Sequence, residues 1–460
     1  MTAFEQYLAS VRGKRAAVIG IGVSNTPLIR LLVQAGASVT ACDRRVREKF
    51  DGKLDELERL GVELRLGEDY LDHLDHDLIF RTPGLRPDAP QISAAVARGS
   101  ELTSEMEVFF RVCPCPIIAV TGSDGKTTTT TIISEFLKEA GYEVYLGGNI
   151  GKPLLPDTAQ MSPDGVAVVE LSSFQLQTMK QSPAVAVLTN LAPNHLDWHT
   201  SMEEYIAAKE NIFLHQGAGD TAVFNADNAV TAGLMAKAKG NVVPFSRARE
   251  LDRGVFLKDG VICRADDRGV AQVLPASEIL LPGVHNVENY MAAIAAVGGL
   301  VPNDAIRAVA RRFSGVEHRI ELVRTLDGVR YYNDSIGTSP SRTISGLRCF
   351  EQKVILIAGG YDKHIPFDEL GVEIVKRVKQ LILTGATAQS IKCAVELAPD
   401  YRSGAPEITV IDDFEAAVKQ ARTLAVPGDV VLLSPACAAF DKFNNFMERG
   451  DTFKRIVNGF

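Results

Sequence analysis

Short apolar runs alternate with helical stretches along most of the chain. In the first hundred residues, segments 15–19, 38–42 and 77–80 predict strands, and segment 26–35 predicts a helix that ends at Gly36. Strands that alternate with helices are typical of a parallel sheet with helices on its faces. The pattern therefore predicts an α/β fold.

The middle of the chain repeats this rhythm. Segments 116–120, 166–171 and 184–190 are continuous apolar runs, as expected for central parallel strands. Segment 237–280 is richer in turns and short strands, and a helix is expected from about 287 to 300. A third series of strands follows, which predicts a further sheet, with strands at 329–333, 354–358, 380–383, 408–411 and 430–433.

The changes in rhythm predict three domains, in agreement with a prior of roughly 150 residues per domain for 460 residues. We expect a Rossmann-like N-terminal domain, a central sheet of the P-loop ATPase type and a Rossmann-like C-terminal domain. The expected ranges are 1–104, 105–313 and 314–460.

Composition narrows the functional classes. The net charge of −8 is unfavourable for nonspecific nucleic-acid binding. The chain has neither an apolar run of about 18 residues nor the apolar core of a signal peptide, which predicts a cytoplasmic protein without a membrane span. Seven cysteines, with Cys113-Pro-Cys115 as the closest pair and no metal-type spacing, fit a reducing compartment.

The first loop with candidate chemistry is Gly20–Asn25, which reads GIGVSN. It follows a predicted strand, opens a predicted helix and precedes an acidic residue, Asp43, by about 20 residues. Asn25 replaces the third glycine of a dinucleotide fingerprint. Close backbone approach and a helix N-terminus still favour a diphosphate group. The alternative is a tight turn without a ligand.

The loop Thr121–Thr127 carries the strongest signal. It reads TGSDGKT and ends like a P-loop, although Val120 stands where the first Walker glycine would be. Backbone N–H groups can cradle phosphates there, Lys126 can reach the β- and γ-phosphates, and the Thr127 hydroxyl can bind Mg²⁺. The alternative is a glycine-rich turn with a surface lysine. Thr127–Thr131 is a poor helix-forming run, but its hydroxyls can help to cap the helix.

Two further strand ends are expected beside this loop, because ligands of open α/β sheets lie at the carboxyl ends of the strands. Glu170 follows an apolar run, where its charge needs a cation, and Mg²⁺ is the simplest partner. The alternative for Glu170 is helix capping. His195 follows the next strand and either binds a metal, pairs with a carboxylate or is structural.

The third domain has polar loops at three strand ends: 333–339, 359–364 and 434–441, with His318-Arg319 upstream. Each could be an ordinary turn, but together they predict a binding face. An ATP–Mg²⁺ site between two ligand-binding domains indicates an enzyme that joins two substrates at the expense of ATP. A GTPase is disfavoured because the chain lacks a clear NKxD-type motif.

At these residues the sequence resembles the Mur ligase family of peptidoglycan synthesis over essentially the whole chain. The motifs occur in the family's order: TGSDGKTTT, GGNIG (147–151), ELSSFQL (170–176), NHLDWH, HNVEN (285–289), HRIE (318–321), NDS (333–335) and LLSPACAAFDKF (432–443). ELSSFQL and LLSPACA are most like the branch that adds D-glutamate.

The resemblance implies an ATP-dependent amide ligase that adds D-glutamate to UDP-N-acetylmuramoyl-L-alanine through an acyl phosphate in cytoplasmic precursor synthesis. It implies two Mg²⁺ ions, no nicotinamide or flavin, and we expect a monomer. The implied catalytic residues are Lys126, His195 and Lys209. The implied metal ligands are Thr127, Glu170, His195 and Lys209 as a carbamate. From the residues alone, Lys209 would be a solvated helix lysine.

The resemblance also implies three sets of binding residues, one for each ligand. The ATP set is Gly122, Ser123, Asp124, Gly125, Lys126, Thr127, Thr128, Asn286, Asn289, Arg319 and Asp334. The UDP-sugar set is Gly22, Val23, Ser24, Asp43, Arg44, Gly84, Asn149, Ser172 and Gln175. The D-glutamate set is Thr338, Lys363, Ala439, Phe440 and Phe446.

Some residues depart from the family's pattern. Ile336 stands where a lysine is usual, so the amino-acid pocket is less cationic or is compensated by Arg342 or His364. Ala439 replaces a frequent serine, and Asp124 adds an anion to the phosphate loop.

Three alternatives remain open. The chain could be another amide ligase of the superfamily, such as a folylpolyglutamate synthase or a Mur ligase for a different amino acid. It could instead be a noncatalytic sensor of nucleotide and UDP-sugar, although such a sensor would not need Lys126, Glu170, His195 and Lys209 together. A dehydrogenase would rest on the GIGVSN loop alone.

Overall fold

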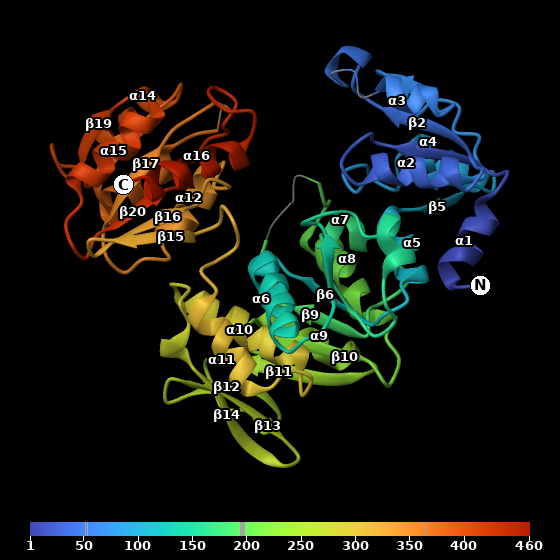
Figure 1. Cartoon of the computed structure of the whole chain (residues 1–460), viewed down its shortest axis with the longest axis horizontal. Coiled ribbons are helices and arrows are strands. Elements are labelled where there is room, and N and C mark those ends of the chain that lie inside the picture. Colours follow the sequence, from blue (N-terminus) through green and yellow to red (C-terminus); the bar gives the residue numbers. More distant parts are fainter. Residues whose placement is uncertain (51, 53, 194–197, 364) are drawn as a thin grey trace. The chain divides into compact units, whose positions relative to one another are not determined.

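The computed structural model describes the chain except residues 51, 53, 194–197 and 364 (Figure 1). The chain forms two compact units. The first comprises Met1–Glu278 and Val287–Val309, and the second comprises Ile279–Asn286 and Ala310–Phe460. The first unit holds two sheets and the second unit holds one.

The N-terminal sheet is parallel, in the order β3-β2-β1-β4-β5. Its strands are β1 (Arg15–Ile19), β2 (Ser38–Asp43), β3 (Glu63–Leu66), β4 (Leu78–Phe80) and β5 (Glu101–Thr103). The helices of this region are α1 (Ala3–Val11), α2 (Asn25–Gln34), α3 (Leu54–Arg59) and α4 (Pro90–Ala97), with a 3₁₀ turn, η1 (Arg47–Phe50). The three predicted strands and the predicted helix are confirmed to within one or two residues. The short polar strands β3 and β5 were not predicted.

The central sheet has the order β14-β13-β12-β11-β10-β9-β6-β8-β7. It is parallel from β12 to β7 and continues as an antiparallel meander, β12-β13-β14. The bounds are β6 (Ile117–Thr121), β7 (Val144–Gly148), β8 (Val166–Glu170), β9 (Val185–Leu188), β10 (Thr221–Asn225), β11 (Asn241–Ser246), β12 (Gly254–Lys258), β13 (Val261–Asp266) and β14 (Gly269–Pro275). The predicted strands at 116–120, 166–171 and 184–190 correspond to β6, β8 and β9.

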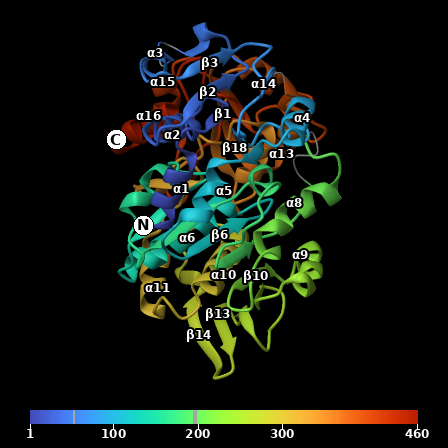
Figure 2. The same cartoon turned by 90° about the vertical axis from the view of Figure 1, so that its right-hand side faces the viewer.

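Helices cover both faces of this sheet. They are α5 (Glu105–Val112), α6 (Lys126–Glu139), α7 (Ser173–Leu176), α8 (Met202–Leu214), α9 (Ala229–Leu234), α10 (Val284–Val297) and α11 (Asn303–Arg312), with 3₁₀ turns η2 (Leu155–Gln160), η3 (Met235–Lys237) and η4 (Ala276–Glu278). Helix α6 packs on β6 and β8, and α8 packs on β6 and β9 (Figure 2). Helix α10 begins three residues before its predicted start.

The C-terminal sheet has the order β15-β16-β20-β17-β18-β19, and all its strand pairs are parallel except β15 with β16. Its elements are β15 (Glu321–Leu326), β16 (Val329–Asn333), α12 (Pro340–Leu347), β17 (Val354–Ala358), α13 (Asp368–Arg377), β18 (Val378–Leu383), α14 (Ala388–Glu396), β19 (Glu407–Val410), α15 (Phe414–Leu424), β20 (Val430–Leu433) and α16 (Phe446–Asn458). The predicted strands are confirmed, and the edge strand β15 was missed.

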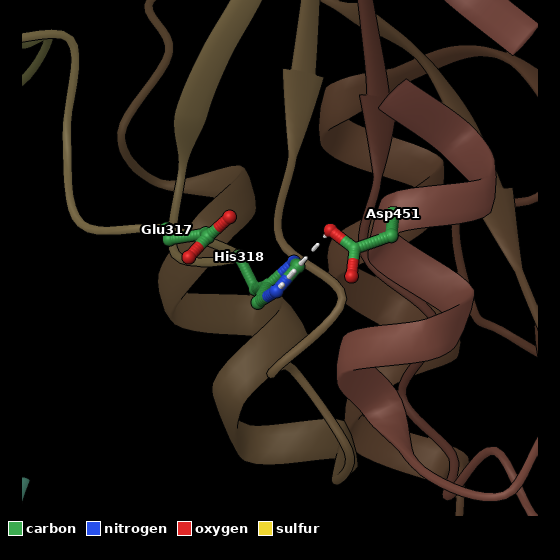
Figure 3. Close-up of side chains that lie close together, drawn as sticks. All are labelled: Glu317, His318 and Asp451. Carbon is green, nitrogen blue, oxygen red and sulfur yellow. Dashed lines mark ion pairs between the residues drawn. The ribbon is translucent and has the colours of Figure 1, made fainter. Parts of the chain in front are cut away.

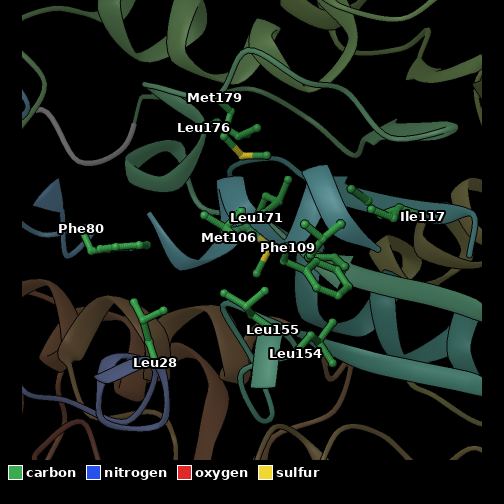
Figure 4. Close-up of a cluster of buried hydrophobic side chains, with 14 of the residues drawn as sticks. Leu28, Phe80, Met106, Phe109, Ile117, Leu154, Leu155, Leu171, Leu176 and Met179 are labelled. Carbon is green, nitrogen blue, oxygen red and sulfur yellow. The ribbon is translucent and has the colours of Figure 1, made fainter. Parts of the chain in front are cut away.

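One apolar core joins the N-terminal and central sheets within the first unit. Leu28 and Phe80 belong to the same buried cluster as Met106 and Phe109 of α5 and Ile117 of β6 (Figure 4). Burying a large apolar side chain contributes about 1.5–3 kcal/mol. Helix α5 is therefore a packed connection between the two sheets.

Across the described residues, the helices lack the combination of length and apolarity that spanning a bilayer requires.

Candidate functional site

The phosphate loop lies between β6 and α6, and two of its glycines have positive φ angles. Gly125, at the start of α6, has a φ of 76°. Gly122 has a φ of 153°, and a Cβ atom there would lie 1.9 Å from Thr189 Oγ1. The loop can hold this shape only because glycine has no side chain.

Within α6, Thr130 and Thr131 donate hydroxyl hydrogen bonds of 2.8 Å to the carbonyl oxygens of the residues four positions earlier.

The segment after β9 anchors the loop. Ser123 N donates to the Asn190 carbonyl oxygen and Asp124 N to Asn190 Oδ1, both at 2.9 Å. Ser123 Oγ donates to the Ala192 carbonyl oxygen and lies 2.9 Å from Tyr205 OH. Asp124 itself is exposed. Sequence reasoning missed Asn190 and Tyr205. Tyr205 lies four residues before Lys209, a spacing that puts both on one face of α8.

Lys126 folds back over the loop. Its ammonium donates to the carbonyl oxygens of Gly122 at 2.9 Å and Ser123 at 2.8 Å. These hydrogen bonds already have a charged donor, and an anionic acceptor adds the attraction between opposite charges. A phosphate oxygen would therefore be a better acceptor for this ammonium than either carbonyl.

Glu170 ends β8, is 1% exposed and receives hydrogen bonds on both carboxylate oxygens. Thr127 Oγ1 donates to Oε2 at 2.7 Å, and Asn149 Nδ2 donates to Oε1 at 2.8 Å. The structure thus brings together Thr127, Glu170 and Asn149. A hydroxyl and a carboxylate are the oxygen ligands that Mg²⁺ prefers, so this pair fits the implied metal.

Lys209 is buried, 1% exposed, on α8. Its Nζ donates to Thr121 Oγ1 at 3.0 Å and to the Gly122 carbonyl oxygen at 2.9 Å, and it lies 5.0 Å from the ring centre of Tyr205. Burial, followed by the charge of Lys126, holds the pKa of Lys209 well below its ordinary value. The expectation of a solvated helix lysine, from the residues alone, is wrong. The unprotonated amine that this pKa favours is the form that can react with CO₂.

The remaining members of the predicted ATP set divide between the two units. Asn289 lies against the loop in the first unit: Thr129 Oγ1 donates to Asn289 Oδ1 at 3.3 Å, and a Cβ atom on Gly125 would meet this oxygen at 2.3 Å. Thr128 is half-buried on α6. Asn286, Arg319 and Asp334 belong to the second unit. His195 lies outside the described residues.

In the N-terminal domain, Asp43 holds the GIGVSN loop. Its carboxylate accepts the Ile21 N–H at 2.8 Å and forms an ion pair of 2.8 Å with Arg45. Burial raises the pKa of Asp43, but hydrogen bonds from Arg45 and Ile21 outweigh it and bring this pKa below its ordinary value. Asn25 Nδ2 donates to the carbonyl oxygens of Ile19 and Gly20 at 2.9 and 3.0 Å, which closes the turn without a third glycine.

The other predicted UDP-sugar residues fall into two groups. Gly22, Val23, Ser24, Arg44 and Gly84 are exposed on the N-terminal domain. Ser172 and Gln175 form the capping box of α7, with Gln175 N donating to Ser172 Oγ at 3.3 Å and Ser172 N to Gln175 Oε1 at 3.0 Å. Asn149 belongs to neither group and donates to the Glu170 carboxylate.

Arg81, which sequence reasoning missed, connects the N-terminal domain to α7. It directly follows β4 and is 2% exposed. Its guanidinium donates to the carbonyl oxygens of Pro83 at 3.0 Å, Leu85 at 2.6 Å and Phe174 at 2.8 Å. The sequence feature that could have identified Arg81 is a charged residue directly after a buried strand.

We expect Arg81→Met to lower the free energy of unfolding by about 3 kcal/mol, because three part-buried carbonyl groups lose their charged donor. Denaturant unfolding of the full chain measures this change. Arg98→Met is the matched control, since Arg98 is exposed and donates 3.1 Å to one carbonyl oxygen, that of Leu74. Equal stability of both variants would contradict a structural role for Arg81.

In the second unit, the structure brings together two residues of the predicted D-glutamate set. Lys363 Nζ donates to the Thr338 carbonyl oxygen at 3.1 Å. Ala439 is buried, whereas Phe440 is 64% exposed with its ring centre 6.0 Å from that of Tyr361. Phe446 begins α16, and its carbonyl oxygen accepts the Ser335 hydroxyl at 2.7 Å.

Arg342 and His364 are the residues proposed to compensate for the missing lysine at Ile336. Arg342 Nη1 donates to the Ile336 carbonyl oxygen at 3.2 Å, so its guanidinium lies beside the position that lacks the usual lysine. His364 lies outside the described residues.

Asp334 is buried, 4% exposed, after β16. Ser434 Oγ donates to Asp334 Oδ2 at 2.6 Å. Burial raises the pKa of Asp334 to about 7, although the Ser434 hydrogen bond and the charge of Arg319 oppose the shift. The free chain would release this proton near pH 4.

The shift predicts a specific pH dependence for Asp334→Asn. Between about pH 4 and pH 7 the folded wild-type protein binds the proton and the unfolded chain does not, so the free energy of unfolding falls as pH rises. The variant lacks this slope. At pH 8 its free energy of unfolding should exceed that of the wild-type protein by on the order of 3 kcal/mol. Denaturant unfolding at several pH values measures it. The exposed Asp400→Asn is the control, and an unchanged slope in Asp334→Asn would contradict the assignment.

Glu317, His318 and Asp451 form a cluster that resembles a metal site (Figure 3). Lys454 already supplies a cation there: its ammonium pairs with Glu317 and lies 3.1 Å from Asp451. Burial, followed by the charge of Lys454, lowers the pKa of His318. The cluster is therefore explained as an ion-pair network that holds the segment before β15.

Models of three domain families match the chain. The Mur ligase MurD-like N-terminal domain matches residues 14–104, the Mur ligase middle domain residues 120–297, and the Mur ligase glutamate ligase domain residues 318–437.

Three relatives match this chain over almost its whole length. A UDP-N-acetylmuramoylalanine–D-glutamate ligase of Acetivibrio thermocellus is 52% identical over 460 residues and covers 99% of each chain. The protein of the same name from Ruminiclostridium cellulolyticum is 50% identical, over 99% of this chain and 98% of its own. That of Clostridium beijerinckii is 48% identical with the same coverage.

Solved structures share the fold. The UDP-N-acetylmuramate-alanine ligase of Thermotoga maritima matches with a TM-score of 0.59 and 18% identity, over 97% of this chain and 99% of its own. A pseudomurein peptide ligase type C from Methanothermus fervidus matches with a TM-score of 0.54 and 19% identity, over 97% and 100%. Given the matches of all three domains and relatives about half identical over the full length, this chain belongs to the Mur ligase family.

Proposed function

We propose that this chain joins D-glutamate to UDP-N-acetylmuramoyl-L-alanine, with ATP as the energy source. As a Mur ligase, the chain is an ATP-dependent enzyme that forms a peptide bond in the synthesis of peptidoglycan precursors. The choice of substrates rests on one observation, the 52% identity over the whole chain to a ligase with that name.

The proposed reaction begins with transfer of the γ-phosphoryl group. A carboxylate oxygen of the L-alanyl group attacks the γ-phosphorus, and ADP leaves. The amine of D-glutamate then attacks the acyl carbon, loses a proton and displaces inorganic phosphate, which leaves an amide. The first step brings two anions together, so it needs positive charge at the transferring group.

The phosphate loop supports this step through its own residues. The loop's backbone N–H groups and the Lys126 ammonium can bind the triphosphate, with Lys126 exchanging its carbonyl acceptors for phosphate oxygens. Thr127 and Glu170 would hold a Mg²⁺ ion, which when bound would neutralise charge on the phosphates. We propose two such ions, with His195 and a carbamate on Lys209 as ligands of the second.

The ligand sets of the outer domains stay proposals of the same kind. Lys363, beside Thr338, would pair with a carboxylate of D-glutamate. The exposed residues of the GIGVSN loop would bind the uridine-diphosphate end, with Asp43 holding that loop. We also propose that the enzyme acts in the cytoplasm as a monomer.

Phosphate release from ATP with UDP-N-acetylmuramoyl-L-alanine tests the proposal, using D-glutamate, L-glutamate, L-lysine and meso-diaminopimelate in turn. We expect release with D-glutamate alone and a product heavier by one glutamyl residue. Release with a different acceptor would keep the ligase chemistry and overturn the amino acid. No release with any acceptor would overturn the UDP-sugar and favour a sensor.

A further inference from the structure

Two thiols lie side by side where α5 ends and β6 begins. Cys113 is the C-cap residue of α5, and Cys115 lies two residues before β6. Their sulfur atoms are 3.7 Å apart, and Cys113 Sγ donates to the Cys115 carbonyl oxygen at 3.4 Å. Cys113 is half-buried, whereas Cys115 is buried. The pair is thus in contact, and one of its members is only partly buried.

Pro114 holds the pair in this arrangement. Proline fixes its own φ angle and confines the preceding residue to extended conformations. Cys113 has such a conformation, with φ of −59° and ψ of 125°. Little backbone freedom is therefore lost if the sulfurs join, and side-chain rotation must bring them from 3.7 Å to about 2.0 Å.

The two sulfurs are chemically unequal. The contact between the two thiols lowers the pKa of Cys115, against the effect of burial, whereas the same contact and burial raise the pKa of Cys113. The thiolate is the nucleophile in disulfide exchange. Cys113 is the less buried of the two residues, and Cys115 is the better thiolate for closing the ring.

We propose that Cys113 and Cys115 are a redox-active pair that forms a reversible intramolecular disulfide with low-molecular-weight disulfides as the oxidant. Cys113, once deprotonated, attacks the external disulfide and releases one thiol, which gives a mixed disulfide. Cys115 then attacks the Cys113 sulfur and releases the second thiol. The two cysteines lose two electrons and two protons, and the external disulfide is reduced to two thiols.

The small ring of such a disulfide makes it reversible. Only Pro114 separates the two cysteines, so the bond closes a short and strained loop. Strained disulfides are more oxidising and more easily reduced than structural ones. The pair would therefore be oxidised when the thiol pool is oxidised and would return to the dithiol when that pool recovers.

Oxidised glutathione with the folded full-length chain tests the proposal, followed by alkylation in denaturant. All seven cysteines are free, so the reduced chain takes up seven alkyl groups. The chain with one disulfide takes up five. Trypsin places both thiols, without any other cysteine, in the peptide 112–126. We expect this peptide from the oxidised chain to be two hydrogen atoms lighter than its unalkylated dithiol form. Reduced glutathione, added before alkylation, should restore both thiols.

Two variants and one reference state sharpen the result. Cys113→Ser should abolish the disulfide, whereas Cys393→Ser, at an exposed cysteine, should leave it unchanged. The disulfide should form at least tenfold faster in the folded chain than in urea, because folding holds the sulfurs together. A peptide that carries only glutathione adducts, or equal rates in folded and unfolded chains, would overturn the proposal.

Discussion

Lys126→Ala should lower kcat/KM for phosphate release by about 10²–10³-fold, the usual cost of removing one preorganised donor from a developing charge. The ammonium contacts two carbonyl oxygens of its own loop, so its loss should shift the melting temperature little. Steady-state phosphate release with UDP-N-acetylmuramoyl-L-alanine and D-glutamate measures the effect. Lys126→Arg keeps the charge and should recover part of the activity.

Lys138→Ala is the matched control for this experiment. Lys138 lies on the same helix, α6, is exposed and pairs with Glu135 at 2.9 Å. It should retain the activity of the unaltered chain. Equal activities of Lys126→Ala and Lys138→Ala would show that the loop does not use its lysine and would contradict the proposed ATP site.

Lys209→Met should lower the same rate by about 10²-fold if a carbamate on Lys209 stabilises charge in the site. The reaction with CO₂ requires the neutral amine, which the buried position favours. We therefore expect activity to fall when CO₂ is removed from the buffer and to recover on addition of bicarbonate. The variant should not respond to bicarbonate.

The lowered pKa of Lys209 also predicts a stability signal when the amine is unmodified. Between this pKa and the ordinary value of 10.5, the unfolded chain holds a proton that the folded chain lacks. The free energy of unfolding should therefore rise with pH across this window and level off above 10.5. Lys209→Met should lose the rise.

Lys237→Met controls for both measurements. Lys237 also contacts α8, through a 2.7 Å ion pair with Glu210, but its side chain is 52% exposed. It should keep its activity, its bicarbonate response and its pH slope. Full activity of Lys209→Met, with no effect of CO₂ on the unaltered chain, would refute the carbamate.

The sequence predicted the parallel strands well because these strands are buried on both faces. The segments that became β6, β8 and β9 are continuous apolar runs, and their ends located the phosphate loop and Glu170. Most strands that escaped prediction lie at sheet edges: β15 has no continuous apolar run, and β3 has no fully buried residue. The short strand β10 also escaped, although it is buried inside the central sheet. Edge strands are set by their partners more than by their own hydrophobicity.

Side-chain partners were less predictable than strand ends. The environment of Lys209 depends on Thr121 and Gly122, which are 88 and 87 positions away, and no local pattern reports such a distance. For the same reason the sequence did not indicate that the Asp43 carboxylate is hydrogen-bonded to Ile21 and Arg45 within its own domain. Long-range contacts of this kind require the fold.

The threonines of α6 bear on how this protein could be engineered for heat tolerance. Thr130 and Thr131 direct their hydroxyls back to Lys126 and Thr127, and threonine costs a helix about 0.5 kcal/mol per residue relative to alanine. Alanine there would be an obvious choice for a stabilising library. Because those hydroxyls bond to the carbonyl groups of the last two residues of the phosphate loop, the substitutions would also alter the loop itself. Heat-tolerant variants are better sought on the exposed positions of α15 and α16.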